Sequence, residues 1–179
     1  MKIIGVVGYP ASGKGEFSAV AKEAGIPVVV MGDIIRKKTA ERGLELTDAN
    51  VGAVACALRK ELGMDAVAVL TAEEVSRLSA PAVVIDGIRG DSEIAYFKSA
   101  FTDFTVVHVK ASFETRLARM KTRGRDDDAA DTADLQARDS REESFGLKRA
   151  AELADITIVN EADRESYLCR VRKILGVQL

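Results

Sequence analysis

A glycine-rich loop near the beginning of the chain limits what this sequence can fold into more than any other feature. An apolar run precedes the loop, a segment of helical periodicity follows it, and it reads Gly8-Tyr9-Pro10-Ala11-Ser12-Gly13-Lys14-Gly15. Glycines let the backbone fold back so that several N–H groups converge on phosphate oxygens, and a helix that begins there adds its positive dipole end. Lys14 adds a mobile charge for the β- and γ-phosphates. Strand, loop, lysine and helix in this order predict a nucleotide-phosphate site formed by the loop and Glu16.

Composition and charge narrow the classes of function. The chain has 179 residues, of which 47% are apolar, so one domain with a sizeable core is expected. A net charge of −2 predicts no broad basic surface and no nucleic-acid partner. No apolar stretch approaches the roughly 18 residues of a membrane span, and the stretch before the loop is too short for a signal peptide. We therefore expect a cytoplasmic protein without a membrane partner, as a monomer or weak homodimer.

The residue types that most often bind metals are few and scattered. His108 is the single histidine, and it lies in an apolar run, where a packed residue is expected rather than a catalyst. Cys56 and Cys169 are far apart, lack the spacing of metal ligands and stand among the apolar positions of helical segments. We expect both to be buried free thiols in a reducing compartment.

Apolar runs alternate with helical patterns along the whole chain. The predicted strands are residues 2–8, 27–31, 82–86, 104–110 and 156–160. This alternation is typical of parallel β-α units with helices on both faces of the sheet, an α/β fold. Residues 32–81 have room for three helices, and residues 111–155 for two helices around a charged turn. Both segments are longer than a simple crossover needs, so we expect helical insertions that fold over a ligand.

An acidic residue stands at or just after the end of the second and third predicted strands, and an arginine follows it three residues later. Asp33 can cap the next helix, and Arg36 then lies one turn further on at the carboxyl edge of the sheet, where α/β folds bind ligands. Asp86 ends an apolar strand, the position from which such folds hold Mg²⁺ through water, and Arg89 follows after Gly87. The alternatives are a helix cap with a solvated arginine and an ordinary Asp-Gly turn. Their place beside the loop favours a second anion site and a metal site.

Arginines are paired at helical spacing on both sides of a charged turn. Arg116 and Arg119 lie three residues apart, Arg138 and Arg141 repeat the spacing, and three aspartates at residues 126–128 stand between the pairs. Four arginines on two facing helices can surround a phosphoryl group during transfer, because its charge needs such donors. The alternative is an exposed hairpin with internal ion pairs. The last predicted strand ends at the same edge in Asn160, a candidate for hydrogen bonding to a base through its side chain or backbone.

These motifs resemble, in their order, those of nucleoside monophosphate kinases. More closely, the chain resembles an archaeal group described as adenylate-kinase-related, and its ending Ala154-Asp155…Asn160 is similar to that of dephospho-CoA kinases. The resemblance implies a three-layer P-loop fold whose five parallel strands have the order 2-3-1-4-5. It also implies a single domain over residues 1–179, divided into a core (residues 1–31, 82–119 and 142–179), an acceptor-binding helical insertion (residues 32–81) and a lid (residues 120–141).

The same resemblance implies a role for each candidate residue. ATP with Mg²⁺ occupies the loop, Arg36 and Arg89 bind the phosphate of the acceptor beside Asp33, and Arg116 stacks near the adenine. Lys14 assists transfer together with three arginines of the lid, Arg119, Arg138 and Arg141. Glu16 departs from the pattern, because adenylate kinases commonly have threonine there. A carboxylate at that position repels phosphate unless it turns away or reaches the metal, which leaves catalytic efficiency open.

The sequence thus favours a kinase that moves the γ-phosphoryl group of ATP to a small phosphorylated acceptor, foremost a nucleoside monophosphate. Two alternatives stay open. One is phosphorylation of dephospho-CoA, which needs a pocket for a pantetheine arm. The other is a nucleotide-binding regulatory protein with slow hydrolysis, for which Glu16 is the main argument.

Overall fold

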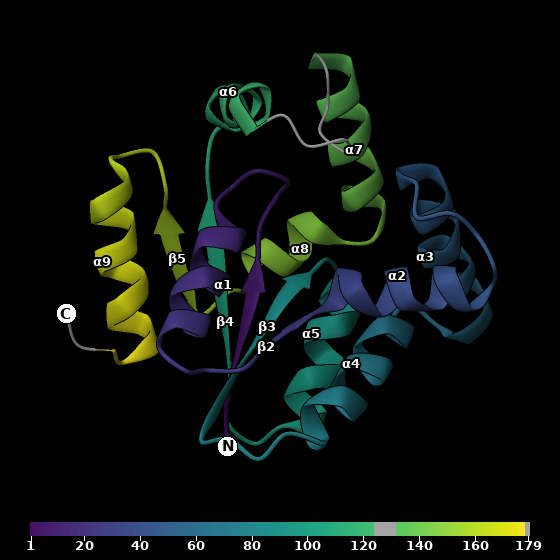
Figure 1. The fold of residues 1–179 in the computed structure, drawn as a ribbon, viewed down its shortest axis with the longest axis horizontal. Helices are drawn as coiled ribbons and strands as arrows, with labels where there is room; N and C mark the ends of the chain where they lie inside the picture. Colours follow the sequence, from purple (N-terminus) through teal and green to yellow (C-terminus); the bar gives the residue numbers. More distant parts are fainter. Residues whose placement is uncertain (124–131, 178–179) are drawn as a thin grey trace.

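Five strands form one parallel sheet in the computed structural model, which describes residues 1–123 and 132–177 (Figure 1). The strands are β1 (Lys2–Val7), β2 (Val28–Val30), β3 (Ala82–Ile88), β4 (Phe104–Lys110) and β5 (Ile156–Val159). Their order is β2-β3-β1-β4-β5, and every pairing is parallel. The predicted strands, their parallel direction and the strand order are therefore confirmed.

Alternating side chains of the strands pack on two separate layers of helices. Ile3 and Val7 of β1 belong to one apolar cluster, and Ile4 and Val6 belong to the other. This follows from the two-residue period of a strand, which sends successive side chains to opposite faces. One layer consists of α1 (Lys14–Glu23) and α9 (Arg164–Leu175); the other contains α2 (Met31–Glu41), α3 (Asp48–Leu62), α4 (Ala66–Ser76), α5 (Asp91–Ala100) and α8 (Leu147–Glu152).

The two long connections form the walls above and beside the carboxyl ends of the strands. The helices α2, α3 and α4 fill the predicted insertion, while α6 (Phe113–Arg123) and α7 (Thr132–Ser144) lie above the sheet edge (Figure 1). Two helices were expected in residues 111–155, but the described part of that segment contains α8 as well. Gly146 explains the difference: with φ at 98° it ends one helix and begins the next, which apolar periodicity alone does not reveal.

A bulge in β3 shapes the edge where the loop lies. Val6 pairs with Asp86 and Val7 with Ile88, so Gly87 is an extra residue in this strand. Its φ of 95° lies in the left-handed region, which favours glycine. The bulge brings Asp86 to the end of the regular pairing beside β1, and Arg89 follows just beyond it.

The structure contradicts the expectation of buried thiols. Cys56 and Cys169 are exposed, not buried, because each lies on the outward side of its helix next to buried neighbours. His108 lies half-buried within β4, and burial, followed by the charges of Lys110 and Lys14, lowers its pKa. The three aspartates at 126–128 lie outside the described residues.

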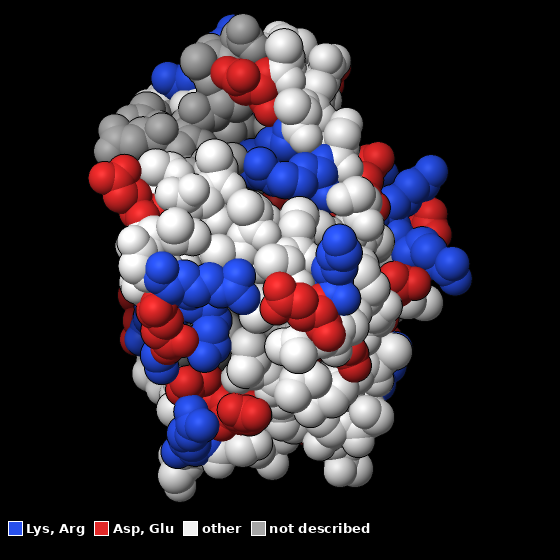
Figure 2. Space-filling model, turned by 90° about the vertical axis from the view of Figure 1, so that its right-hand side faces the viewer, with Lys and Arg blue, Asp and Glu red and all other residues white. Residues whose placement is uncertain are grey.

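Charges of both signs are mixed on the molecular face drawn in Figure 2. Lysine and arginine side chains alternate there with aspartate and glutamate, and no wide area carries one sign. Within residues 1–123 and 132–177, no helix combines the length and the apolar character that crossing a bilayer requires.

Candidate active site

The glycine-rich loop joins β1 to α1 and encloses the side chain of Lys14. Its ammonium donates hydrogen bonds to the carbonyl oxygens of Gly8 (2.6 Å) and Tyr9 (3.1 Å). A cavity of about 490 Å³ opens beside the loop. Its lining includes Pro10, Ala11, Gly13, Lys14, Gly15, Glu16, Asp86, Arg36, Arg89, Arg119 and Arg138. Side chains from separate parts of the sequence therefore meet here, which places them where a phosphate chain on the loop would lie.

The C-terminal part of the chain holds the loop in shape. Asn160 donates from Nδ2 to the carbonyl oxygen of Ser12 (2.8 Å), and Tyr167 donates from its hydroxyl to that of Gly13 (2.9 Å). Arg119 donates to the backbone oxygen of Asn160 (2.9 Å). Gly13 has φ at 115°, and a Cβ there would clash with the amide of Asn160. The side chain of Asn160 thus supports the loop backbone, and its hydrogen bonding to a base stays a prediction.

Burial perturbs Lys14 strongly. Removal from water lowers its pKa to about 8, with smaller lowering effects from Arg89 and Arg138, while Asp86 and Glu142 oppose them. With a pKa of about 8, Lys14 loses its positive charge at mildly basic pH, where an ordinary lysine keeps it. A phosphate chain on the loop would need the charged form, so affinity for a nucleotide would depend on this titration.

We therefore expect the dissociation constant of Mg-ATP to be constant below about pH 8 and to rise up to about tenfold per pH unit above it. The dissociation constant rises with pH because the ligand binds the protonated lysine. Above the pKa of Lys14, a growing share of the free protein lacks that proton. Calorimetric titrations between pH 7 and 9.5 measure the effect. Lys14→Arg is the matched control, since arginine stays charged over this range and its affinity should not change. A wild-type profile as flat as that of Lys14→Arg would contradict the assignment.

Asp86 lies beside the lysine at the end of β3. It is 9% exposed and lines the loop cavity, and its Oδ2 accepts a hydrogen bond from the hydroxyl of Ser18 in α1 (2.7 Å). One carboxylate together with phosphate oxygens is a common ligand set for Mg²⁺, which retains several water molecules. The residues present therefore fit such an ion, with Asp86 as its protein ligand, directly or through water. Its role there would be to offset negative charge on the phosphates.

Glu16 lines the loop cavity, and its carboxylate pairs with an arginine of α9. Its Oε2 accepts hydrogen bonds from both Nε (3.1 Å) and NH2 (2.6 Å) of Arg164 at the beginning of α9. Both side chains are exposed, and the positive partner offsets the charge that would repel a phosphate. The departure from the adenylate kinase pattern at this position is thus accommodated by an ion pair that no local pattern predicts.

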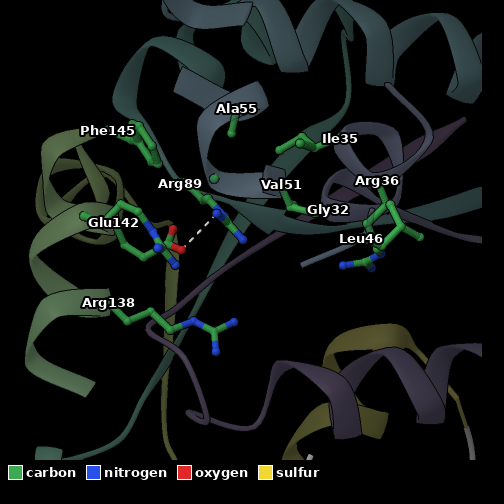
Figure 3. A pocket seen from close by; sticks show the side chains of 12 residues that line it. Gly32, Ile35, Arg36, Leu46, Val51, Ala55, Arg89, Arg138, Glu142 and Phe145 are labelled. Carbon is green, nitrogen blue, oxygen red and sulfur yellow. Dashed lines mark ion pairs between the residues drawn. The ribbon is translucent and has the colours of Figure 1, made fainter. Parts of the chain in front are cut away.

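A second cavity of about 190 Å³ adjoins the first and shares four lining residues with it, Gly32, Arg36, Arg89 and Arg138. Figure 3 shows these side chains around the opening between α2, α3 and α7. The other lining residues are Ile35, Leu46, Val51, Gly52, Ala55, Arg141, Glu142 and Phe145. Arginine side chains therefore dominate one part of the cavity wall, and apolar side chains dominate the rest.

Two of these arginines have carboxylate partners. Arg36 forms an ion pair with Asp33, three residues earlier on α2. Arg89 forms one with Glu142 of α7, at 2.8 Å between NH1 and Oε1. Asp33 and Arg36 are about half exposed or more, whereas Glu142 is buried. An anionic ligand can compete for the exposed pair at little cost in solvation, because exposed ion pairs are weak.

The helix α7 is fastened to the loop by two further contacts. Arg116 of α6 forms a bidentate pair with Asp139 of α7 at 2.9 and 2.6 Å, and its guanidinium lies 5.0 Å from the centre of the Tyr9 ring. The Tyr9 hydroxyl donates to Glu143 of α7 (2.7 Å). Arg116 is only 4% exposed, so it joins α6, α7 and the loop in this structure. A base stacked on it would have to share it with Asp139.

Sequence reasoning did not identify Ser18, Asp139 or Glu142 as parts of this site. Ser18 follows Lys14 by four residues, so helical spacing was a usable signal for it. Asp139 and Glu142 stand among charged residues of α7 and carry no local signal of their partners. Among the predicted residues, Gly8, Tyr9, Ser12, Asp33, Arg116 and Asn160 support or flank the cavities but do not line them.

Comparison with known proteins shows the family of this chain. A family model described as an AAA domain matches residues 7–134. A UPF0200 protein of Methanoculleus marisnigri is 51% identical over 175 residues, which cover 98% of this chain and 96% of the relative. The chain belongs to the UPF0200 family.

Solved structures show the fold of this UPF0200 chain in more distant proteins. Shikimate kinase from Bacteroides thetaiotaomicron has a TM-score of 0.65 at 14% identity, with 98% of this chain and 99% of that chain covered. A gluconokinase from Sinorhizobium meliloti has a TM-score of 0.55 at 19% identity, with 98% and 95% covered. These similarities confirm the P-loop kinase fold that the motifs predicted. At such identities they establish the fold alone.

Proposed function

We propose that this UPF0200 chain transfers the γ-phosphoryl group of ATP to a small anionic acceptor, foremost a nucleoside monophosphate. The observation that carries the proposal is the pair of adjoining cavities, one at the glycine-rich loop and one lined by arginines, which share Arg36, Arg89 and Arg138. Phosphoryl transfer needs alignment of two substrates and positive charge around the moving group, but no nucleophilic side chain. A donor site that opens directly into an anion site meets both needs.

The residues at the junction can perform the required tasks. Lys14 binds the phosphate chain, while Arg138 borders both cavities and Arg119 borders that of the loop, where negative charge is redistributed during transfer. The contacts of α7 with Arg89, Arg116 and Tyr9 hold it over the sheet edge. A helix in that position limits the access of water and so disfavours hydrolysis.

The composition of the second cavity supports a nucleotide acceptor over a polyhydroxylated one. Among its described lining residues, no side chain carries a hydroxyl, an amide or an imidazole. Among these lining side chains, a polyhydroxylated acceptor would depend for its hydrogen bonds on arginines and on Glu142, which already pairs with Arg89. Arginines suit a phosphate, and apolar walls that include Val51, Ala55 and Phe145 suit a planar base.

Dephospho-CoA remains the second candidate acceptor, for a specific reason. Leu46 lines the same cavity yet is 58% exposed, so an apolar surface continues from the cavity toward solvent. A pantetheine arm could lie along such a surface. The pairing of Glu16 with Arg164 supports an enzyme over the third interpretation, a regulatory protein with slow hydrolysis, because it relieves the repulsion on which that interpretation rests.

A coupled assay for ADP release tests the proposal, with Mg-ATP and a panel of acceptors. The panel contains the nucleoside monophosphates, dephospho-CoA, shikimate and gluconate, with a reaction lacking acceptor as the baseline. We expect stimulation by one or more nucleoside monophosphates. Stimulation by dephospho-CoA alone would replace the nucleotide acceptor with the second candidate. Equal slow hydrolysis with and without every acceptor would contradict the proposed function.

Arg36→Ala and Arg89→Ala are expected to raise the KM of the acceptor by about 10-fold to 100-fold and to leave the KM of ATP nearly unchanged. Each arginine offers a charge-assisted contact of roughly 1.5–3 kcal/mol to an anionic group in the second cavity. Steady-state kinetics with each substrate varied in turn provides the measurement. Arg77→Ala is the control, since that exposed arginine pairs with Glu73 and Glu74 away from both cavities. A selective rise in the KM of ATP would show that the two sites are exchanged.

A further inference from the structure

A buried ion pair lies behind the arginine-lined cavity. Arg59 of α3 and Glu93 of α5 are 2.6 Å apart between NH2 and Oε1, and their side chains are 3% and 0% exposed. Burying two charges costs solvation energy that their attraction only partly offsets, so apolar residues of similar size often stabilise a fold as well or better. Stability alone therefore does not explain why two charged residues occupy this place.

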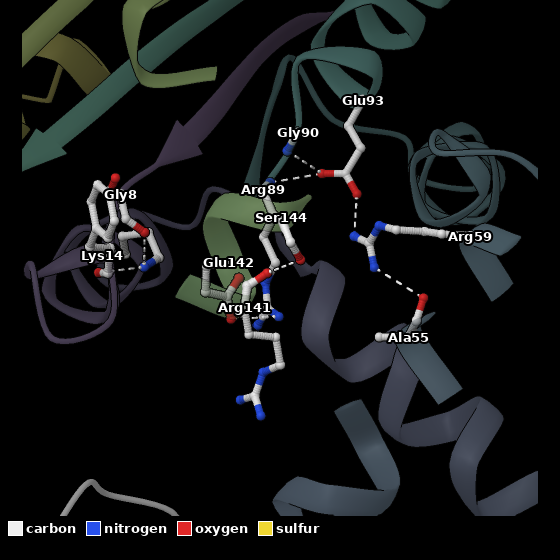
Figure 4. Close-up of polar contacts among 11 residues, drawn as sticks. Gly8, Lys14, Ala55, Arg59, Arg89, Gly90, Glu93, Arg141, Glu142 and Ser144 are labelled. Atoms are coloured by element: carbon white, nitrogen blue, oxygen red, sulfur yellow. Dashed lines mark hydrogen bonds and ion pairs between the residues drawn. The ribbon is translucent and has the colours of Figure 1, made fainter. Parts of the chain in front are cut away.

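The second oxygen of Glu93 contacts the turn that carries Arg89. It accepts hydrogen bonds from the backbone N–H of Arg89 (2.8 Å) and of Gly90 (3.2 Å), as Figure 4 shows. A glutamate at the third position of a helix often caps the residue before the helix, which accounts for the bond to Gly90. Capping accounts neither for the shorter bond to Arg89 nor for an arginine supplied by a different helix.

Arg59 connects this carboxylate to two walls of the cavity. Its guanidinium lies 4.3 Å from the centre of the Phe145 ring and donates to the carbonyl oxygen of Ala55 (3.3 Å). Phe145, which directly follows α7, and Ala55 of α3 both line the cavity. The ion pair is thus the point at which α3, α7 and the turn after β3 meet.

The turn itself has little freedom to move. A Cβ on Gly90 would lie 2.6 Å from the carbonyl oxygen of Phe145, so the two backbones are in direct contact. The guanidinium of Arg89 is held at its other end by Glu142, at 2.8 Å. Glu93 therefore holds the backbone of Arg89 in place, while Glu142, or an anion that replaces it, holds the side chain.

We propose that Glu93, oriented by Arg59, is a positioning residue that aims Arg89 at the phosphate of the acceptor. The inference rests on the proposed function, because that function supplies the acceptor which Arg89 contacts. Glu93 touches no substrate in this arrangement. Its effect reaches the acceptor through the backbone of Arg89 and, by way of Arg59, through the packing of α3 against the end of α7.

Glu93→Gln tests this directly, because it preserves the size of the side chain but replaces one acceptor oxygen with a donor that must face N–H groups. We expect the KM of the acceptor to rise about tenfold or more, while the dissociation constant of Mg-ATP changes by less than about twofold. Glu165→Gln is the matched control, since Glu165 is exposed and pairs with Arg172 on α9. An unchanged acceptor KM, or an equal loss of ATP affinity, would overturn the positioning role.

The double variant Arg59→Met with Glu93→Leu separates positioning from stability. Two apolar residues of similar size remove the buried charges together, so the thermal midpoint should recover toward that of the wild type. The acceptor KM should nevertheless stay raised, because the leucine accepts no hydrogen bond from Arg89. Recovery of both the midpoint and the acceptor KM would show that the pair serves stability only.

A binding measurement makes the test independent of turnover. Titration of the wild-type protein with inorganic phosphate should shift the backbone amide signals of Arg89 and Gly90 in a ¹⁵N-¹H correlation spectrum, and Glu93→Gln should need about tenfold more phosphate for the same shift. If no acceptor stimulates the wild type but this difference persists, the proposed function fails and the positioning of Arg89 stands. Equal phosphate affinity in both proteins refutes the positioning role.

Discussion

Lys14→Ala is expected to weaken the binding of Mg-ATP about 100-fold or more without unfolding the protein. Lys14 is half-buried and lines the loop cavity, and its ammonium donates hydrogen bonds to the carbonyl oxygens of Gly8 and Tyr9, which hold it within the loop. A charge-assisted contact in such surroundings contributes roughly 1.5–3 kcal/mol, and the lysine can contact more than one phosphate. Isothermal titration calorimetry at pH 7 measures the change.

The stability of this variant provides an independent check. Burial lowers the pKa of Lys14 to about 8, which means that the folded protein disfavours the charge it carries at pH 7. Removing the side chain should therefore leave the thermal midpoint unchanged or raise it. Lys22→Ala, at an exposed position of the same helix, serves as the control for helix propensity and net charge. Wild-type affinity in Lys14→Ala would exclude a phosphate site at the loop.

Asp86→Asn should keep most of the affinity for nucleotide but lose about 100-fold or more of the magnesium-dependent turnover. The amide keeps the shape of the side chain and can still accept a hydrogen bond from Ser18, yet it lacks the charge that attracts the ion and its water molecules. Magnesium titrations of the rate, at saturating ATP and acceptor, provide the measurement. A wild-type rate with an unchanged magnesium midpoint would remove Asp86 from the metal site.

Ser18→Ala is a milder change at the same site. It keeps the carboxylate of Asp86 and deletes only the buried hydrogen bond that orients it, so a smaller loss of about tenfold is expected. If the two variants lose equal activity, the orientation that Ser18 gives the carboxylate of Asp86 matters as much as its charge.

Much of the fold follows from patterns that act over short distances. Strand and helix periods are properties of neighbouring residues, and the alternation of apolar runs with helical segments predicted the five parallel strands within a residue or two of their ends. The extra helix α8 was missed because a single glycine, Gly146, divides two helices without changing the apolar period.

Some features of the candidate site could likewise be predicted from the sequence, and others could not. Lys14, Asp86, Arg36 and Arg89 could be named from the sequence because each ends or follows a predicted strand, and parallel strands end at one edge. All four line the loop cavity in the structure. Which carboxylate meets which arginine could not be named, because candidate partners of either sign are plentiful in a chain of which 30% is charged.

The sequence by itself determined the glycine-rich loop, the order of the secondary structure and the edge at which the charged residues gather. Only the tertiary structure decided which charged side chains pair: Glu16 with Arg164, Arg116 with Asp139, and Arg59 with Glu93. The partners in these pairs are separated by 23 to 148 residues along the chain. Local periodicity carries no information over such separations, since the packing of whole helices sets which side chains come within bonding distance.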